Sequence, residues 1–261
     1  MVDDKYIKPF KMYGNLYFVG NRRVSVHIIK TEVGLVMIDT GYPDMYDVIV
    51  NNMKELGLDP KDICAIIHSH GHIDHFGCTK QFKEISGAKT YIGRQDNDIA
   101  NGKLDLSWAK ELGLERVEPF DCDVLIDDGD EFKFGTTTIR CLNTPGHTDG
   151  VISIFVNVEE NGKSIIAAMF GGIGKNSLKA SFLNEYNLSF DCREKFRNSI
   201  HRLAKEHVDL PMGNHPNQTN TEGKLEKIMK GEFTVNPNEW QKFLENTEKS
   251  LDAFLEKEQN I

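Results

Sequence analysis

The sequence predicts an α/β protein in which two β-sheets lie back to back with helices outside them, as a four-layer αβ/βα sandwich. Two observations predict this fold. β-rich runs give way to amphipathic helices twice along the chain, and no Pro/Gly-rich linker separates the two halves. The 261 residues, of which 39% are apolar, suffice for one large core. We therefore expect a single domain over residues 1–261.

The first half is typical of short strands separated by Gly and Asn turn signals. These strands are expected over residues 16–20, 24–31, 34–41, 63–69 and 88–93. Apolar residues recur at helical spacing over 44–57, where Gly57 ends the helix, and again over 79–86.

The second half repeats this arrangement. Strands are expected over residues 136–148, 151–158, 164–170 and 208–213, and helices over 192–207 and 237–258. The terminal helix carries an apolar stripe that includes Trp240, Phe243 and Leu251. We expect this stripe to dock on the body of the domain rather than to bind a partner.

The composition excludes several classes of function. The net charge is −9 and the basic clusters are short, so we expect no nucleic-acid partner. No apolar run reaches the roughly 18 residues that span a membrane. The start MVDDKYIKPF does not have the features of a signal peptide, and the five scattered cysteines indicate reduced thiols. We expect a cytoplasmic protein that acts on a small molecule.

Residues 68–77, HSHGHIDHFG, hold four of the nine histidines beside an aspartate. They follow an apolar strand and open a helix, where a rigid support can hold binding groups. In an extended segment alternate side chains share a side, so His70 and His72 can reach one ion. Asp74 and His75 lie where the chain turns into the helix and can reach a second point nearby. We expect His68 to be structural or to support the ligands from behind.

The residue types in this cluster indicate a metal site. Imidazole and carboxylate without a thiolate favour Zn²⁺, with Fe or Mn as alternatives. A mononuclear site needs three protein ligands and a water, which four candidates within six residues exceed. The excess indicates either two metal ions or one ion beside a carboxylate that transfers protons.

Three further residues follow strand ends in the same way. His147 lies in NTPGHTDG, His215 in PMGNHPNQ and Asp39 in MIDTG. A metal site assembled from several strand ends requires this placement, so we expect both histidines to join the site. Asp39 is expected to hold the metal-binding loop from behind.

Together these stretches resemble the metallo-β-lactamase fold superfamily. The H-x-H-x-D-H motif stands at residues 70–75, PGHT at 145–148 and IDTG at 38–41. The resemblance covers essentially the whole chain and implies two zinc ions per chain. It implies that one is held by His70, His72 and His147, and the other by Asp74, His75 and His215. A hydroxide between the metals would be the nucleophile, and Asp74 would be the catalytic residue that orients it and relays a proton.

Most members of this superfamily carry a bridging Asp between the PGHT strand and the last histidine, but Gly172 stands there in this chain. This departure and the terminal helix resemble the subclass B3 metallo-β-lactamases. That subclass implies serines near positions 172 and 174 that hold the β-lactam carboxylate, and both positions are glycine here. Asn176, Ser177 and Lys175 are candidate substitutes, and Gly172 and Asn176 are candidate pocket residues.

The leading interpretation is a dinuclear zinc hydrolase, B3-like, that attacks a cyclic amide such as a β-lactam. One alternative is a cytoplasmic lactonase or thioesterase-type hydrolase of the same fold with little β-lactamase activity. Another is a non-catalytic metal-binding protein. Substrate specificity is expected in the segments 93–120 and 173–190, where Trp108 is a candidate apolar wall and Tyr186 a candidate oxyanion donor. The first segment is alternatively a packed insertion.

Overall fold

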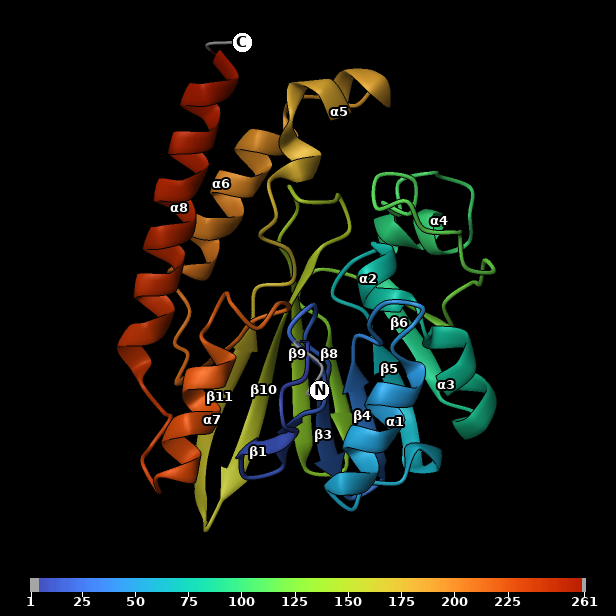
Figure 1. Cartoon of the computed structure of the whole chain (residues 1–261). Helices are drawn as coiled ribbons and strands as arrows, with labels where there is room; N and C mark the ends of the chain where they lie inside the picture. The colour runs from blue at the N-terminus through green and yellow to red at the C-terminus, as the bar shows by residue number, and fades with distance from the viewer. Residues whose placement is uncertain (1–4, 260–261) are drawn as a thin grey trace.

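The computed structural model describes residues 5–259 and contains two sheets packed face to face (Figure 1). The seven-stranded sheet follows chain order: Phe10–Tyr13 (β1), Leu16–Phe18 (β2), His27–Thr31 (β3), Gly34–Ile38 (β4), Ile63–Ile67 (β5), Lys89–Gly93 (β6) and Val124–Ile126 (β7). The five-stranded sheet has the order β12-β11-β10-β9-β8: Leu210–Met212, Lys163–Met169, Ile152–Glu160, Thr137–Asn143 and Glu131–Phe134.

Helices cover the outer face of each sheet (Figure 1). Apolar side chains of Tyr46–Glu55 (α1) and Thr79–Ser86 (α3) pack on the first sheet. Those of Cys192–Leu203 (α6) and Pro237–Gln259 (α8) pack on the second. Trp240 of α8 is fully buried there and its Nε1 donates to the Leu203 carbonyl at 3.1 Å. The predicted four-layer sandwich and the docking of the terminal helix are confirmed.

The remaining helices are short and lie between these layers or at their edge. They are Ile73–Phe76 (α2), Asn97–Ala100 (α4), Ala180–Glu185 (α5) and Thr221–Met229 (α7), with 3₁₀ turns at Pro60–Asp62, Arg94–Asp96 and Asn176–Leu178. None of the helices within residues 5–259 is both long and apolar enough to cross a lipid bilayer.

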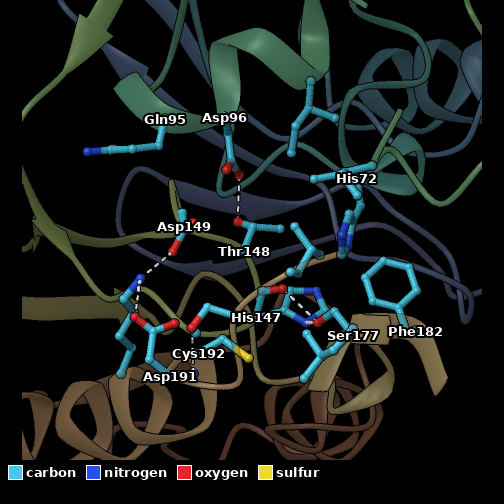
Figure 2. Close-up of a pocket in the computed structure, with 17 residues that line it drawn as sticks. His72, Gln95, Asp96, His147, Thr148, Asp149, Ser177, Phe182, Asp191 and Cys192 are labelled. Carbon is cyan, nitrogen blue, oxygen red and sulfur yellow. Dashed lines mark hydrogen bonds and ion pairs between the residues drawn. The ribbon is translucent and has the colours of Figure 1, made fainter. Parts of the chain in front are cut away.

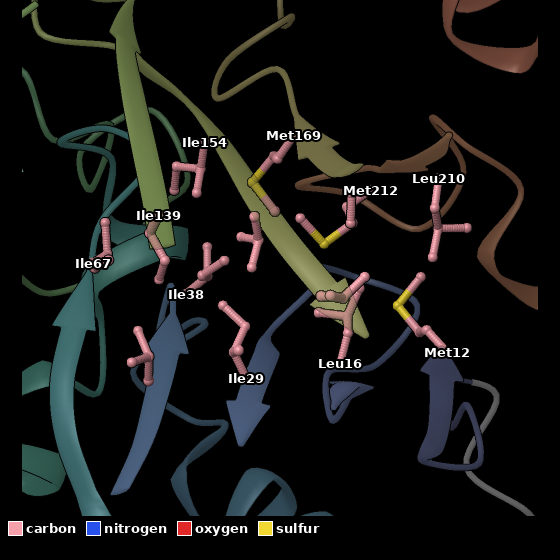
Figure 3. Packing of buried hydrophobic residues seen from close by; sticks show 14 of the residues in the cluster. Met12, Leu16, Ile29, Ile38, Ile67, Ile139, Ile154, Met169, Leu210 and Met212 are labelled. Atoms are coloured by element: carbon pink, nitrogen blue, oxygen red, sulfur yellow. The ribbon is translucent and has the colours of Figure 1, made fainter. Parts of the chain in front are cut away.

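The main core lies between the two sheets, where branched and sulfur-containing side chains from both meet (Figure 3). Ile38 and Ile67 come from the first sheet, and Ile139, Ile154 and Met169 come from the second. All five are fully buried. Burial of this kind contributes about 1.5–3 kcal/mol for each such side chain and holds the two sheets together.

The strand directions bring the loops that carry the candidate ligands to one edge of the two sheets. β4, β5, β6 and β7 run parallel, so their carboxyl ends meet at one edge of the first sheet. β9 and β11 are both antiparallel to β10, and β12 is parallel to β11, so these three strands also end together. Ligands of such sheets bind beyond the carboxyl ends of the strands.

Some boundaries differ from the prediction for identifiable reasons. The strand expected over 34–41 ends at Ile38, because Asp39 adopts a left-handed backbone with φ of 58°. The strand expected over 136–148 ends at Asn143, just before Pro145 and Gly146. β1, β7 and β8 were not predicted, since strands of three or four residues form through pairing with their neighbours rather than through local pattern.

Candidate functional site

The six expected ligands lie together in two groups at the shared strand edge. His70, His72 and His147 form what we call the first ligand group, and Asp74, His75 and His215 form the second ligand group. Within each group the candidate ligand atoms all lie within 4.8 Å of one another. The rings of His70 and His75 are 4.2 Å apart, so the two groups adjoin.

Local structure explains how one short segment supplies both groups. After β5 the chain stays extended through His72, whose φ and ψ are −94° and 147°, and this residue then caps α2. Asp74 and His75 follow within the four-residue helix. The change from extended chain to helix directs consecutive side chains at two neighbouring points.

The histidines of the first ligand group present nitrogen atoms to one point. His70 Nε2 is 3.2 Å from His72 Nδ1 and 3.2 Å from His147 Nε2. His70 Nδ1 donates to the Gly171 carbonyl at 2.8 Å, and His147 Nδ1 donates to the Gly174 carbonyl at 2.7 Å. Because carbonyl oxygens only accept, these bonds assign the hydrogen to Nδ1 and leave both Nε2 lone pairs facing inward.

The second ligand group contains a carboxylate as well as imidazoles. Asp74 Oδ2 lies 3.3 Å from His75 Nε2 and 3.5 Å from His215 Nε2. His215 Nδ1 donates to the Arg23 carbonyl at 2.7 Å, which again leaves Nε2 free to bind. This group therefore offers two imidazole nitrogens and one carboxylate oxygen.

Asp39 holds His75 of the second ligand group from behind and also binds Ser69, the residue before His70. Its Oδ2 accepts from His75 Nδ1 at 2.8 Å and from the Ser69 hydroxyl at 2.8 Å, and its Oδ1 accepts from the Ser69 backbone N–H at 2.7 Å. The side chain is fully buried. A carboxylate behind a ligating histidine fixes the ring orientation and raises its basicity.

The pKa values of the two groups shift in opposite directions. Burial and the neighbouring imidazoles hold the pKa of His70 and His72 well below the usual range, and burial lowers that of His147 to about 4. Burial also disfavours a charge on His75, but Asp74 and Asp39 overcome it and raise the pKa of His75 to about 10. The second ligand group thus attracts positive charge, whereas the first consists of neutral imidazoles.

These features fit a metal-binding site. The Nε2 lone pairs of His70 and His147 face each other at 3.2 Å and repel, and a cation between them removes the repulsion. Each group has three nitrogen or oxygen ligands, which suits Zn²⁺ with an open position for water. Outer hydrogen bonds already fix four of the five rings, at His70, His75, His147 and His215.

One buried carboxylate that the sequence did not reveal joins two of the ligand loops. Asp96 accepts from the Gly71 N–H at 2.7 Å, the Thr148 hydroxyl at 2.6 Å and the Gly150 N–H at 2.8 Å. Burial raises the pKa of Asp96 to about 6 despite these three donors. Asp96 therefore ties the loop of His70 and His72 to the loop of His147.

A cleft of about 500 Å³ opens over both groups, and its lining decides which other predicted residues belong to the site. Trp108 and Asn176 line it, together with Arg23 and Asn214. Trp108 has a left-handed φ of 66°, and its ring lies 5.8 Å from that of His72. Such a conformation is costly for a bulky residue and is typical of functional sites.

Other candidates lie elsewhere. Tyr186 lines neither cavity beside the ligand groups, and its hydroxyl donates to Glu111, so the expected oxyanion role is not supported. His68 is buried behind the site, where its Nε2 is 3.2 Å from the Thr79 hydroxyl. The segment 93–120 is partly a packed insertion, because Leu114, Val117 and Phe120 pack against the α2 region.

Comparison with known proteins places this site in a family. The sequence profile of the Metallo-beta-lactamase superfamily matches residues 19–160, which is more than half of the chain. The chain belongs to the metallo-β-lactamase superfamily. Membership and the converging ligand groups make it a metal-dependent hydrolase rather than a non-catalytic metal-binding protein.

The curated relatives match a smaller share of this chain than the solved structures do. An uncharacterized protein of Aquifex aeolicus is 31% identical over 131 residues, which are 49% of this chain and 59% of that protein. An N-acyl homoserine lactonase from a Bacillus species is 27% identical over 206 residues, or 70% of this chain and 75% of the lactonase.

The structural neighbours cover nearly the whole chain. FEZ-1 metallo-β-lactamase from Legionella gormanii has a TM-score of 0.88 and 25% identity, with 98% of both chains covered. BJP-1, a subclass B3 metallo-β-lactamase of Bradyrhizobium japonicum, has a TM-score of 0.87 and 23% identity, with 98% of this chain and 96% of that one covered. The resemblance to the B3 fold is confirmed.

Gly172, the position of the expected bridging carboxylate, packs directly against the first ligand group. A Cβ atom there would lie 2.6 Å from Cδ2 of His147, and a Cβ at Gly174 would lie 2.9 Å from Cε1 of the same ring. Ser177, a candidate anchor for substrate, instead donates to the His147 carbonyl at 2.6 Å. The resemblance implied a metal-bridging or substrate-binding role at positions 172, 174 and 177. In this protein the residues at these positions contact His147 instead.

Proposed function

We propose that this hydrolase holds two zinc ions and opens a β-lactam ring or a similarly strained cyclic amide. The observation that carries the proposal is the contact of Gly172 with His147, which leaves no room for a bridging carboxylate. This feature matches the resemblance to subclass B3. The near-complete structural coverage by the metallo-β-lactamases FEZ-1 and BJP-1 supports it further.

The two ligand groups would hold one zinc ion each, with Fe or Mn as alternative metals. When bound, the metal would bring the pKa of a coordinated water toward neutrality and polarise the scissile carbonyl group. Asp74 reaches the same point as His75 and His215, and its pKa is held well below the usual range although burial opposes this. It is therefore ionised at neutral pH and can accept a hydrogen bond from a water molecule and so orient it.

The cleft residues would orient the substrate. Trp108 offers an apolar face beside His72, and the exposed Asn176 offers an amide that can donate to the substrate carboxylate. Arg23 also lines the cleft, but its guanidinium Nη1 donates to both carboxylate oxygens of Asp44, at 2.7 and 2.8 Å. Its charge is thus largely compensated, so the cleft binds a substrate anion only weakly by charge.

A second candidate function is lactone hydrolysis, which the N-acyl homoserine lactonases among the curated relatives favour. A lactone and a β-lactam both present a strained carbonyl next to a leaving atom within a ring. They differ because a lactone substrate needs no carboxylate anchor, and the compensated charge of Arg23 suits that difference.

The test measures hydrolysis of a chromogenic cephalosporin and of an N-acyl homoserine lactone by the same zinc-loaded preparation. The proposal predicts that the cephalosporin is turned over with the higher kcat/KM. It also predicts that a chelator abolishes turnover and that added Zn²⁺ restores it. Turnover of the lactone alone would favour lactone hydrolysis over β-lactam hydrolysis. Full activity of metal-free protein would contradict both candidate functions.

A further inference from the structure

A second cavity adjoins the metal-ligand groups but has walls of its own (Figure 2). It shares His72 and His147 with the cleft and has a volume of about 170 Å³. We call it the side cavity. Its apolar lining includes Ile99, Leu106, Phe182, Leu183 and Leu188.

Two of the polar side chains that line the side cavity already have partners. Thr148 donates to Asp96 at 2.6 Å, and Ser177 donates to the His147 carbonyl at 2.6 Å (Figure 2). These two hydroxyl groups therefore do not need an ordered water as a partner. An apolar cavity of roughly 150 Å³ is large enough for a benzene ring. The side cavity thus fits a phenyl-sized apolar group.

The rim of the side cavity is charged and has an excess of acid. Lys195 Nζ lies 3.0 Å from Asp149 and 3.3 Å from Asp191, so one cation faces two carboxylates. All three residues line the cavity. The excess negative charge disfavours an anionic ligand group and favours a neutral or cationic one.

His72 connects the side cavity to the reacting centre. Among the five histidines of the two ligand groups, it alone has no outer hydrogen-bond partner within residues 5–259. Its Nδ1 faces His70, so the hydrogen lies on Nε2 when Nδ1 serves as the ligand. This N–H can donate to a carbonyl oxygen of a molecule that occupies both cavities.

We propose that the side cavity binds the apolar side group of the cyclic amide substrate, and that this group is neutral or cationic rather than anionic. The ring to be opened would lie in the cleft, and the exocyclic amide that joins ring and side group would pass His72. This inference rests on the proposed function for the identity of the ring, but the cavity itself can be tested without turnover.

The kinetic test compares two substrates that share one ring. Benzylpenicillin carries a phenylacetyl side group, and 6-aminopenicillanic acid carries none. In Leu188→Trp the indole fills the side cavity, so KM for benzylpenicillin should rise at least about tenfold while KM for the bare nucleus stays within about twofold. Leu104→Trp, at an exposed position of the neighbouring loop, is the matched control and should change neither. Equal effects of Leu188→Trp on both substrates would overturn the proposal.

The charge preference has its own comparison. A phenylglycyl penicillin carries an ammonium on the side group, and an α-carboxyphenylacetyl penicillin carries a carboxylate at the same position. The wild-type enzyme should show the lower KM for the cationic substrate, and Lys195→Met should widen the difference by removing the only rim cation among the cavity residues within 5–259. A lower KM for the anionic substrate would contradict the assigned charge.

A binding measurement separates this inference from the proposed function. Phenylacetamide binding to the zinc-loaded enzyme is followed by ligand-observed NMR in the wild type and in Leu188→Trp, with thermal melting as the check on folding. Binding to the wild type that is lost in Leu188→Trp supports the side cavity even if neither penicillin is hydrolysed. Equal binding, or no binding to the wild type, overturns the inference even if both penicillins are hydrolysed.

Discussion

The two ligand groups lie side by side but are held in different ways. The first contains three neutral imidazoles, and backbone carbonyls of Gly171 and Gly174 orient two of them. The second contains Asp74, and the buried Asp39 orients its histidine. Two carboxylates therefore accompany the second group, and none belongs to the first.

This difference indicates a division of roles. A divalent cation in the first group would keep nearly its full charge, which is what polarising a carbonyl requires. In the second group Asp74 and Asp39 raise the pKa of His75 to about 10 although burial opposes it, so this group binds a proton when no metal is present. Metal and proton compete there, and zinc affinity at the second group should depend more steeply on pH.

The largest expected effect comes from removing a ligand of the neutral group. His72→Ala deletes one of three imidazoles, so hydrolysis should fall by more than the roughly 10- to 100-fold that loss of an outer partner costs. The fold should remain because His72, although buried, belongs to none of the apolar clusters that form the core within residues 5–259. Zinc content and kcat/KM are measured together with the melting temperature. Turnover like that of the wild type would contradict the assignment of the first ligand group.

The second-largest effect is expected from residues that hydrogen-bond to the ligand histidines of each group. Asp39→Asn keeps the shape of the side chain but removes the charge behind His75, so zinc affinity should fall by about 10- to 100-fold at one of two sites. Ser177→Ala removes one hydrogen bond near His147, whose Nδ1 keeps the Gly174 carbonyl, so affinity should fall by about tenfold at most. Zinc titration with a competing chelator measures both. Equal losses would erase the difference between the groups.

A smaller loss of activity is expected from changing Asp96, which joins the loop of His70 and His72 to the loop of His147. Asp96→Asn leaves one oxygen to accept and turns an amide toward a backbone N–H, so kcat/KM should fall by roughly tenfold. The neighbouring Asp98→Asn is the control, because Asp98 is half-exposed and bonds to Asn101 and Lys103. A similar loss in both variants would show that Asp96 has no specific role in positioning the ligands.

The sequence predicted the parts of the site that depend on side-chain identity and strand ends. The cluster of residues 70–75 and His147 could be found because ligand types follow apolar strands directly. The carbonyl acceptors of Gly171 and Gly174 could not, because backbone groups leave no mark in the sequence. Asp96 was equally hidden, since it stands in RQDND two residues before another aspartate and only folding brings its donors together.

The smallest expected effect concerns the stability of the fold and involves none of the candidate metal ligands. His27 on β3 is fully buried, neither ring nitrogen has a partner within residues 5–259, and burial lowers its pKa from 6.5 to about 4. The unfolded chain therefore takes up this proton first as pH falls, so stability is lost between pH 6.5 and 4. His27→Leu should remove roughly 2 kcal/mol of that loss at pH 5. Urea denaturation at pH 7 and pH 5 measures it, and an unchanged difference between the two pH values would contradict the account.

Zinc stoichiometry tests the central claim most directly. Elemental analysis of the wild-type protein after saturation with Zn²⁺ and removal of excess metal should give two zinc ions per chain, with hydrolysis of the chromogenic cephalosporin rising as the second ion binds. Full activity with a single zinc ion per chain, or with none, would contradict the assignment of two cooperating ligand groups.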